Sequence, residues 1–106
     1  MSVCACRYDV DCRIAGNRGY GGAGMYNFRG SAPVLEDCVF EDNVAERYGG
    51  GMYNDGSAPV LTGCVLRANR AGGDGGAVFN ADPGSAASIP LFFGCRFEAN
   101  VASEEG

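Results

Sequence analysis

The stretch GGGMYNDGSAPVLTGCVLRAN, residues 49–69, decides the fold, because its landmarks recur on both sides at a nearly constant spacing. A motif C-x-Φ-x-x-N, in which Φ is apolar, occurs as CRIAGN (12–17), CVFEDN (38–43), CVLRAN (64–69) and CRFEAN (95–100). The steps between its cysteines are 26, 26 and 31 residues. A repeat of this length predicts a solenoid or another repeat array.

Two further motifs follow the same period and predict short strands. The first occurs as GAGMYN (22–27), GGGMYN (49–54) and GGAVFN (75–80), and the second as SAPVLEDC, SAPVLTGC and SIPLFFGC. Within C-x-Φ, the cysteine and the apolar residue alternate as in a strand, so both point to one face, which we take as the interior. The apolar pairs after Pro33, Pro59 and Pro90 form a second strand, and GMYN with its equivalents forms a third.

The residues that precede the repeated cysteines predict sharp bends. They are Asp and Gly, types that tolerate a positive φ: Asp11, Asp37, Gly63 and Gly94. Three short strands per turn with bends between them predict an all-β fold, a right-handed parallel β-helix of about 3.5 turns with strands ~4.8 Å apart along the axis. A leucine-rich repeat and a WD40 or kelch propeller have different patterns or longer repeats.

The repeat also divides the chain, which we interpret as a single domain over residues 1–106. Residues 1–11 form a partial turn, 12–37, 38–63 and 64–94 are repeats, and 95–106 are a partial turn with a polar tail. The segments after each C-x-Φ-x-x-N are predicted loops, and the longer third step indicates an insertion near residues 81–88.

Composition excludes several function classes. The net charge is −5, and the eight basic residues are dispersed arginines, which argues against a nucleic-acid partner. Histidine, the usual general base, is absent. No apolar run approaches the ~20 residues of a membrane span, and the first residues, MSVCACRYDV, lack the regions of a signal peptide.

The GG[AG][MV][YF]N, SAPxL and C-x-F-x-x-N motifs together resemble the repeats of bacterial right-handed parallel β-helix proteins. That group includes the polymorphic outer membrane protein repeat and belongs to the wider pectate-lyase-like (pectin lyase-like) superfamily. The likeness covers roughly residues 8–102. It implies an extracellular or cell-surface location and the role of a structural or adhesive (adhesin) segment.

The repeated polar positions are candidate structural ladders. We expect buried free thiols in the register Cys12, Cys38, Cys64 and Cys95, since stacked cysteines fit disulfide geometry poorly and behave as small hydrophobes. We expect amide ladders in two registers, Asn17, Asn43, Asn69 and Asn100, and Asn27, Asn54 and Asn80. The C-x-C of Cys4 and Cys6 lacks the further ligands of a metal site, so intermolecular thiol pairing is the favoured interpretation there.

The aromatic register Tyr26, Tyr53 and Phe79 is the candidate ligand site. It predicts a stacked ladder, with the alternative of a flat platform for sugar rings if it faces solvent. Calcium binding through Asp55, Asp74 or Asp82 is a weaker alternative. We predict no metal and no cofactor.

Catalysis is disfavoured because the acidic residues scatter. Hydrolysis of a polysaccharide needs two carboxylates on one face, and the sequence suggests no shared register for Glu36, Glu41, Asp42, Glu46 and Glu98. The leading hypothesis is a structural or adhesive segment without catalysis. The alternatives are a carbohydrate-binding or polysaccharide-lyase-like module, and an expressed fragment without activity. The expected partners are a polysaccharide or further copies of the chain at uncapped ends.

Overall fold

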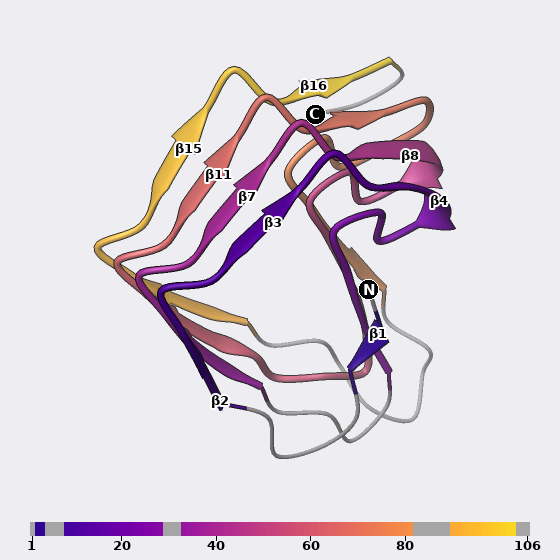
Figure 1. Cartoon of the computed structure of the whole chain (residues 1–106). Coiled ribbons are helices and arrows are strands. Elements are labelled where there is room, and N and C mark those ends of the chain that lie inside the picture. The colour runs from indigo at the N-terminus through magenta and orange to yellow at the C-terminus, as the bar shows by residue number, and fades with distance from the viewer. Residues whose placement is uncertain (1, 4–7, 29–32, 82–89, 104–106) are drawn as a thin grey trace.

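The computed structural model describes residues 2–3, 8–28, 33–81 and 90–103, and the regular structure within these residues is all β-strand. Short strands form four parallel sheets of four strands each. Each sheet is one wall of a solenoid, and the walls follow one another in chain order around every turn (Figure 1). The chain is therefore a parallel β-helix of about 3.5 turns, as the repeat predicts.

The four walls are named sheets A to D in the order in which the chain passes through them. Sheet A contains β1 (Ser2–Val3), β5 (Met25–Asn27), β9 (Met52–Asp55) and β13 (Val78–Ala81). Sheet B contains β2 (Tyr8–Val10), β6 (Val34–Glu36), β10 (Val60–Thr62) and β14 (Leu91–Phe93). Sheet C contains β3 (Arg13–Ala15), β7 (Val39–Glu41), β11 (Val65–Arg67) and β15 (Arg96–Glu98). Sheet D contains β4 (Arg18–Gly21), β8 (Val44–Tyr48), β12 (Arg70–Ala71) and β16 (Val101–Ala102).

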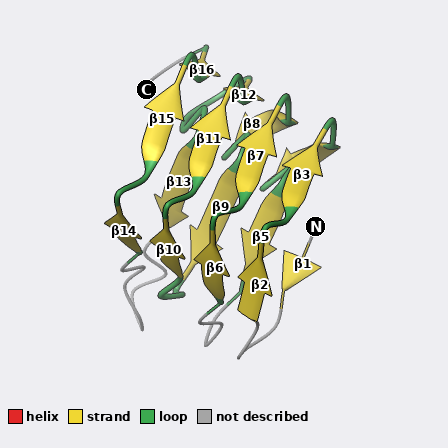
Figure 2. Cartoon of the chain, turned by 60° about the vertical axis from the view of Figure 1, so that its left-hand side comes forward, coloured by secondary structure: helices red, strands yellow, loops and turns green. Residues whose placement is uncertain are grey.

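Equivalent strands of successive turns lie side by side in register (Figure 2). In sheet C, Ile14 pairs with Phe40, Phe40 with Leu66, and Leu66 with Phe97. Like side chains therefore form rows that run along the solenoid axis. We use "row" below for such a set of in-register residues.

The prediction of three strands per turn is wrong, because sheet D supplies a fourth. Its segments were expected to be loops. The inward positions of β8 and β12 are the small residues Ala45 and Ala71, which are buried with Ala23 in a separate cluster. Small interior residues beside glycine and charge do not produce the alternation of large apolar side chains that marks a strand.

The main core fills the space between sheets A, B and C. It is made of fully or almost fully buried side chains that alternate along the strands: Ile14, Met25, Leu35, Cys38, Phe40, Met52, Leu61, Cys64 and Leu66. The predicted interior face of C-x-Φ is thus confirmed for the two middle turns. In the last described turn, the equivalent Phe97 is 48% exposed.

Left-handed residues make the corners of each turn. The four predicted bend residues Asp11, Asp37, Gly63 and Gly94 have φ values of 53°, 52°, 64° and 61°. A second series of left-handed residues separates sheets C and D: Gly16, Asp42, Ala68 and Ala99. A one-residue change of direction at these sites keeps every strand to a few residues and closes the turn tightly.

The glycines that precede β5 and β9 are required by the next turn. A Cβ on Gly24 would meet the carbonyl oxygen of Gly51, and a Cβ on Gly51 would lie 2.6 Å from that of Ala77. Such an approach is closer than van der Waals contact allows. Alanine is found in this row only in the last described turn, at Ala77.

Candidate functional site

The first asparagine ladder runs along the corner between sheets C and D. The Nδ2 group of Asn17 donates to Oδ1 of Asn43 at 2.9 Å, and Nδ2 of Asn43 donates to Oδ1 of Asn69 at the same distance. Asn69 continues the ladder to Asn100 at 3.0 Å. Each accepting Oδ1 also receives the backbone N–H of the preceding asparagine, so Asn43 Oδ1 binds Asn17 N–H at 3.1 Å.

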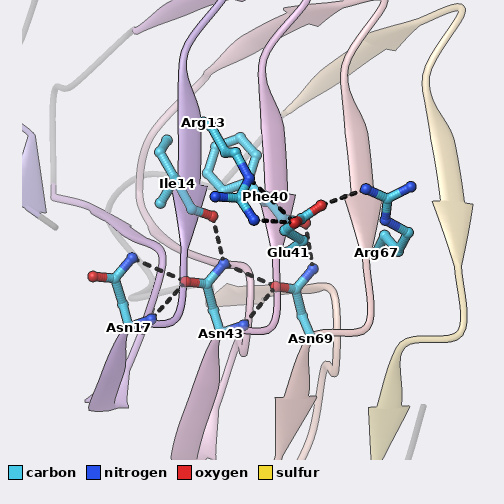
Figure 3. A network of polar contacts seen from close by, with 8 residues as sticks. All are labelled: Arg13, Ile14, Asn17, Phe40, Glu41, Asn43, Arg67 and Asn69. Carbon is cyan, nitrogen blue, oxygen red and sulfur yellow. Dashed lines mark hydrogen bonds and ion pairs between the residues drawn. The ribbon is translucent and has the colours of Figure 1, made fainter.

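The second Nδ2 proton of the asparagine donates to a backbone carbonyl of the preceding turn. Nδ2 of Asn43 donates to the carbonyl of Ile14 at 3.0 Å, and Nδ2 of Asn69 donates to that of Phe40 at 3.0 Å (Figure 3). Asn43 and Asn69 are fully buried. Buried polar groups contribute to stability when their donors and acceptors are matched, and these bonds occupy both donors and the acceptor of each amide.

The second ladder lies inside sheet A. Nδ2 of Asn27 donates to Oδ1 of Asn54 at 2.7 Å, and Nδ2 of Asn54 donates to Oδ1 of Asn80 at 2.8 Å. At the first rung, the buried Oδ1 of Asn27 has no hydrogen-bond partner among the described residues. In the backbone register of sheet A, the residue one turn earlier is Val3.

The cysteine row lies in the interior as four free thiols. Cys38 and Cys64 are fully buried, and Cys12 and Cys95 at the two ends are half-buried. The Cys64 thiol donates weakly to the carbonyl of Leu35 at 3.5 Å, and burial raises its pKa to about 11. A thiol with this pKa is a poor nucleophile at neutral pH. Cys4 and Cys6 lie outside the described residues.

An ion-pair network crosses three turns on the outer face of sheet C, and sequence reasoning missed it. The carboxylate of Glu41 binds the guanidinium groups of Arg13 and Arg67 on either side, and Arg13 Nε adds a 3.2 Å bond to Oε1 (Figure 3). The bonds from Arg67 and Arg13 lower the pKa of Glu41. Its side chain is only 11% exposed, although it lies on the outside of the sheet.

The same row corrects the prediction that the acidic residues share no register. Glu41 and Glu98 lie in one row with Arg67 between them. The alternation of charge along this row was visible in the sequence, because each residue directly follows the Φ position of its repeat. Arg67 lies between the two carboxylates and forms an ion pair with Glu41, whereas Glu98 forms an ion pair with Arg96.

The aromatic register lies on the outer face of sheet A and is half-exposed. The rings of Tyr26 and Tyr53 stack with their centroids 4.8 Å apart and an interplanar angle of 6°. Phe79 continues the stack at 5.2 Å from Tyr53, and Tyr48 packs against Phe79 at 4.7 Å. The neighbours of Tyr53 cover both faces of its ring, so the stack exposes mainly ring edges to solvent. Sugars pack on ring faces, and this arrangement therefore disfavours them.

Polar groups border this stack. The Tyr26 hydroxyl donates to Asp55 at 3.3 Å, and the Arg47 guanidinium lies 5.4 Å from the centre of the Tyr48 ring. Burial and, to a smaller extent, the nearby Asp55 raise the pKa of Tyr53. The register therefore combines aromatic edges, hydroxyl groups and one carboxylate along a single outer stripe.

Other predicted ligands are not gathered into a site. Among residues 2–3, 8–28, 33–81 and 90–103, no three histidine, cysteine or acidic side chains lie close enough to hold a metal ion together. Asp82, one candidate calcium ligand, lies outside these ranges. A shallow depression on sheet D, of about 480 Å³, is bordered by Arg18, Tyr20 and Glu46.

Comparisons with known proteins supply no family. No family model, curated protein or solved structure matches the chain. Within the described residues, no helix is long and apolar enough to cross a membrane.

Proposed function

We propose that the chain is a structural, adhesive-type repeat segment of a bacterial surface or secreted protein, without catalysis of its own. The observation that supports this proposal most strongly is that the polar, charged and thiol side chains of the chain bond to neighbouring turns. The buried asparagines, the thiols and the Arg13–Glu41–Arg67 network all bind between turns. They hold the solenoid together and do not converge on a cavity.

The resemblance of the motifs to bacterial β-helix repeats supports the cellular part of the proposal. Such repeats build elongated parts of exported proteins, including those of the polymorphic outer membrane protein type. A solenoid suits that task, since its length grows by one strand spacing for each added repeat. An extracellular or cell-surface location follows from this proposal.

A carbohydrate-binding or lyase-like module is the second candidate, and the stripe of Tyr26, Tyr53 and Phe79 is the observation that favours it. Aromatic rings bordered by Asp55 form an amphipathic surface of the kind that contacts sugars. The face-to-face stacking counts against it, because the faces of Tyr53 are already covered.

Binding and cleavage assays with the purified chain separate the two candidates. The structural proposal predicts no saturable binding to a panel of neutral and uronic acid polysaccharides, and no shortening of their chains. Saturable binding that is lost in Tyr53→Ala and kept in Val65→Ala, a half-buried position on another sheet, would favour the carbohydrate module instead.

Location is tested with antibodies raised against the purified chain. Labelling of intact source cells, or recovery of the parent protein from their medium, is the expected result. Labelling that appears only after lysis would contradict the surface or secreted assignment.

A further inference from the structure

The two ends of the solenoid have complementary edges. At one end, the interior row of sheet C finishes at Phe97, which is 48% exposed although Phe40 and Leu66 in the same row are fully buried. At the other end, the row begins at Ile14, which is 8% exposed. The C-terminal edge therefore uncovers core-type surface that the other rungs of this row bury.

Within the described residues, the first asparagine ladder has an acceptor at its start and donors at its finish that no hydrogen bond occupies. No described hydrogen bond reaches Oδ1 of Asn17, which points away from the ladder along the axis (Figure 3). At the far end, Nδ2 of Asn100 donates one of its protons to the carbonyl of Leu66 at 2.8 Å. Its second amide proton and its backbone N–H are the groups that bind Oδ1 of the next asparagine at each rung within the chain.

Backbone groups at the two edges repeat this complementarity. Within the chain, Ala68 N–H donates to the carbonyl of Glu98 at 3.0 Å, and Arg96 N–H donates to that of Cys64 at 3.0 Å. One further turn in the same register would set Ala99 N–H opposite the carbonyl of Ala15, and Cys95 carbonyl opposite Arg13 N–H. Two of these groups lie on β3, and the other two lie at the corners on either side of β15.

Outer side chains match as well. Phe93 and Val10 belong to one row of sheet B at opposite ends, and they are 55% and 45% exposed. Arg96 and Arg13 also share a row, but Glu98 binds Arg96 at 2.7 Å and offsets its charge. Apolar side chains would thus cover one another if the ends met in register.

From these observations we propose that a second copy of this chain docks head to tail, with its β3–β4 edge on the β15–β16 edge of the first. Asn17 of the second copy then continues the ladder beyond Asn100, and Ile14 covers Phe97. Strand addition to an open parallel edge supplies main-chain bonds as well as side-chain packing. Because the contact joins different surfaces, it repeats along the axis and produces a linear series of oligomers.

The overall dimensions set an upper limit on the size of the contact, which covers two of the four walls. The molecule measures 32 × 30 × 20 Å, and four strands at ~4.8 Å account for the shortest dimension as the axial one. The end face thus lies within 32 × 30 Å, an outline comparable to the ~800 Å² that each partner buries in a standard interface.

Sedimentation velocity across a concentration series, with reductant to keep the thiols free, tests the proposal. The wild-type chain should form dimers, trimers and longer species in sequence. Phe97→Asp places a charge in the contact and should lower the association constant at least about tenfold, which corresponds to ~1.4 kcal/mol. Thr62→Asp adds the same charge on the outside of an inner turn and should associate like the wild type.

A mixing experiment fixes the direction of docking and guards against a folding defect. Phe97→Asp keeps an intact β3–β4 edge, so an excess of it should cap wild-type oligomers and shorten them. If wild-type oligomers are unchanged by that excess, two like ends meet and the head-to-tail arrangement is wrong. A wild-type chain that stays monomeric at every concentration, or one whose association is unaffected by Phe97→Asp, also overturns the proposal. None of these outcomes bears on the structural or carbohydrate role above.

Discussion

The side-chain amide of Asn43 donates a 2.9 Å hydrogen bond to Oδ1 of Asn69, one full turn further along the solenoid. Both residues are completely buried. The bond shows how a chain with few large apolar residues stabilises successive turns. Each turn inserts an amide that is satisfied only when the turns before and after it are in place, so the ladder couples neighbouring turns.

Asn43→Ala tests the strength of that coupling. The substitution removes the amide that accepts a bond from Asn17 and donates to Asn69 and to the Ile14 carbonyl, so we expect a loss of about 2–4 kcal/mol in unfolding free energy. Asn17→Ala, at the half-buried start of the ladder, should cost only about 1 kcal/mol. Urea denaturation measures both, and equal small losses would show that the ladder contributes little.

Val3→Asn tests whether the second asparagine ladder lacks a donor to Oδ1 of Asn27 at its start. Val3 pairs with Asn27 in the backbone register, and the buried Oδ1 of Asn27 has no hydrogen-bond partner within the described part of the chain. An amide at position 3 would supply the donor, and we expect the unfolding free energy to rise by about 1 kcal/mol. The matched variant Val3→Leu lacks a donor and should give no such gain. A lower stability of Val3→Asn than of Val3→Leu would argue against an unmet acceptor at this position.

Glu41 makes stability depend on pH in the acidic range. Arg67 and Arg13 lower its pKa in the folded state below the ordinary value of 4.5. The folded state therefore binds this proton less readily than the unfolded state. Its stabilising contribution is present above the unfolded pKa and is lost as the pH falls through the folded pKa.

Glu41→Gln removes this titration and provides the measurement. The melting temperature of the wild type should exceed that of Glu41→Gln at pH 7, and the difference should shrink as the pH falls below 4.5. Glu46→Gln, a fully external carboxylate on β8, serves as the control. A wild-type advantage that stays constant across this pH range would show that the effect does not come from the charge of Glu41.

Gly50 tests the close approach of successive turns. A Cβ at this position would meet the carbonyl of Arg70, and it would lie 2.5 Å from the carbonyl of Gly76 and 2.7 Å from the Arg70 nitrogen. All three atoms belong to backbone that cannot move independently, so Gly50→Ala should cost about 3 kcal/mol. Gly16→Ala meets no atom within 4 Å and changes only a left-handed bend, so it should cost about 1 kcal/mol. Similar melting temperatures for the two variants would contradict the packing at Gly50.

Cys64 should be almost inert in the native protein. Burial raises its pKa from 9.0 to about 11, which lowers the thiolate fraction at pH 8 about a hundredfold. Alkylation followed by peptide mass analysis should modify the half-buried Cys12 and Cys95 before Cys64, and urea should abolish the difference. Because the folded pKa is raised, this thiol's contribution to stability decreases as the pH rises above 9. Rapid native labelling of Cys64 would show that the core opens easily.

Much of this architecture is visible in the sequence because one residue type repeats at one structural position. The asparagine and cysteine registers and the Asp or Gly bends mark the turns, and they suffice to predict three of the four walls. Sheet D is not predicted because its row of Gly19, Ala45, Ala71 and Ala102, which is buried in the two middle turns, consists of glycine and alanine and carries no strand signal.

The Arg13–Glu41–Arg67 network is harder to predict for a different reason. Its members are 26 to 28 residues apart, and only the exact register of the strands brings them into contact. A shift of one residue in pairing would turn Glu41 to the opposite face of sheet C. For the aromatic stripe, the shared register of Tyr26, Tyr53 and Phe79 predicts a stacked ladder, but the sequence leaves open whether the rings face solvent.

Native-state hydrogen exchange tests most directly whether bonds between turns hold the solenoid together. The amides of Val39, Val65 and Arg70 donate to carbonyls of the preceding turn at 2.8–2.9 Å. If the turns are coupled as described, these three amides exchange only through global unfolding, with the free energy that urea denaturation gives. Exchange of these amides within minutes under conditions where the chain is folded would contradict a solenoid stabilised from turn to turn.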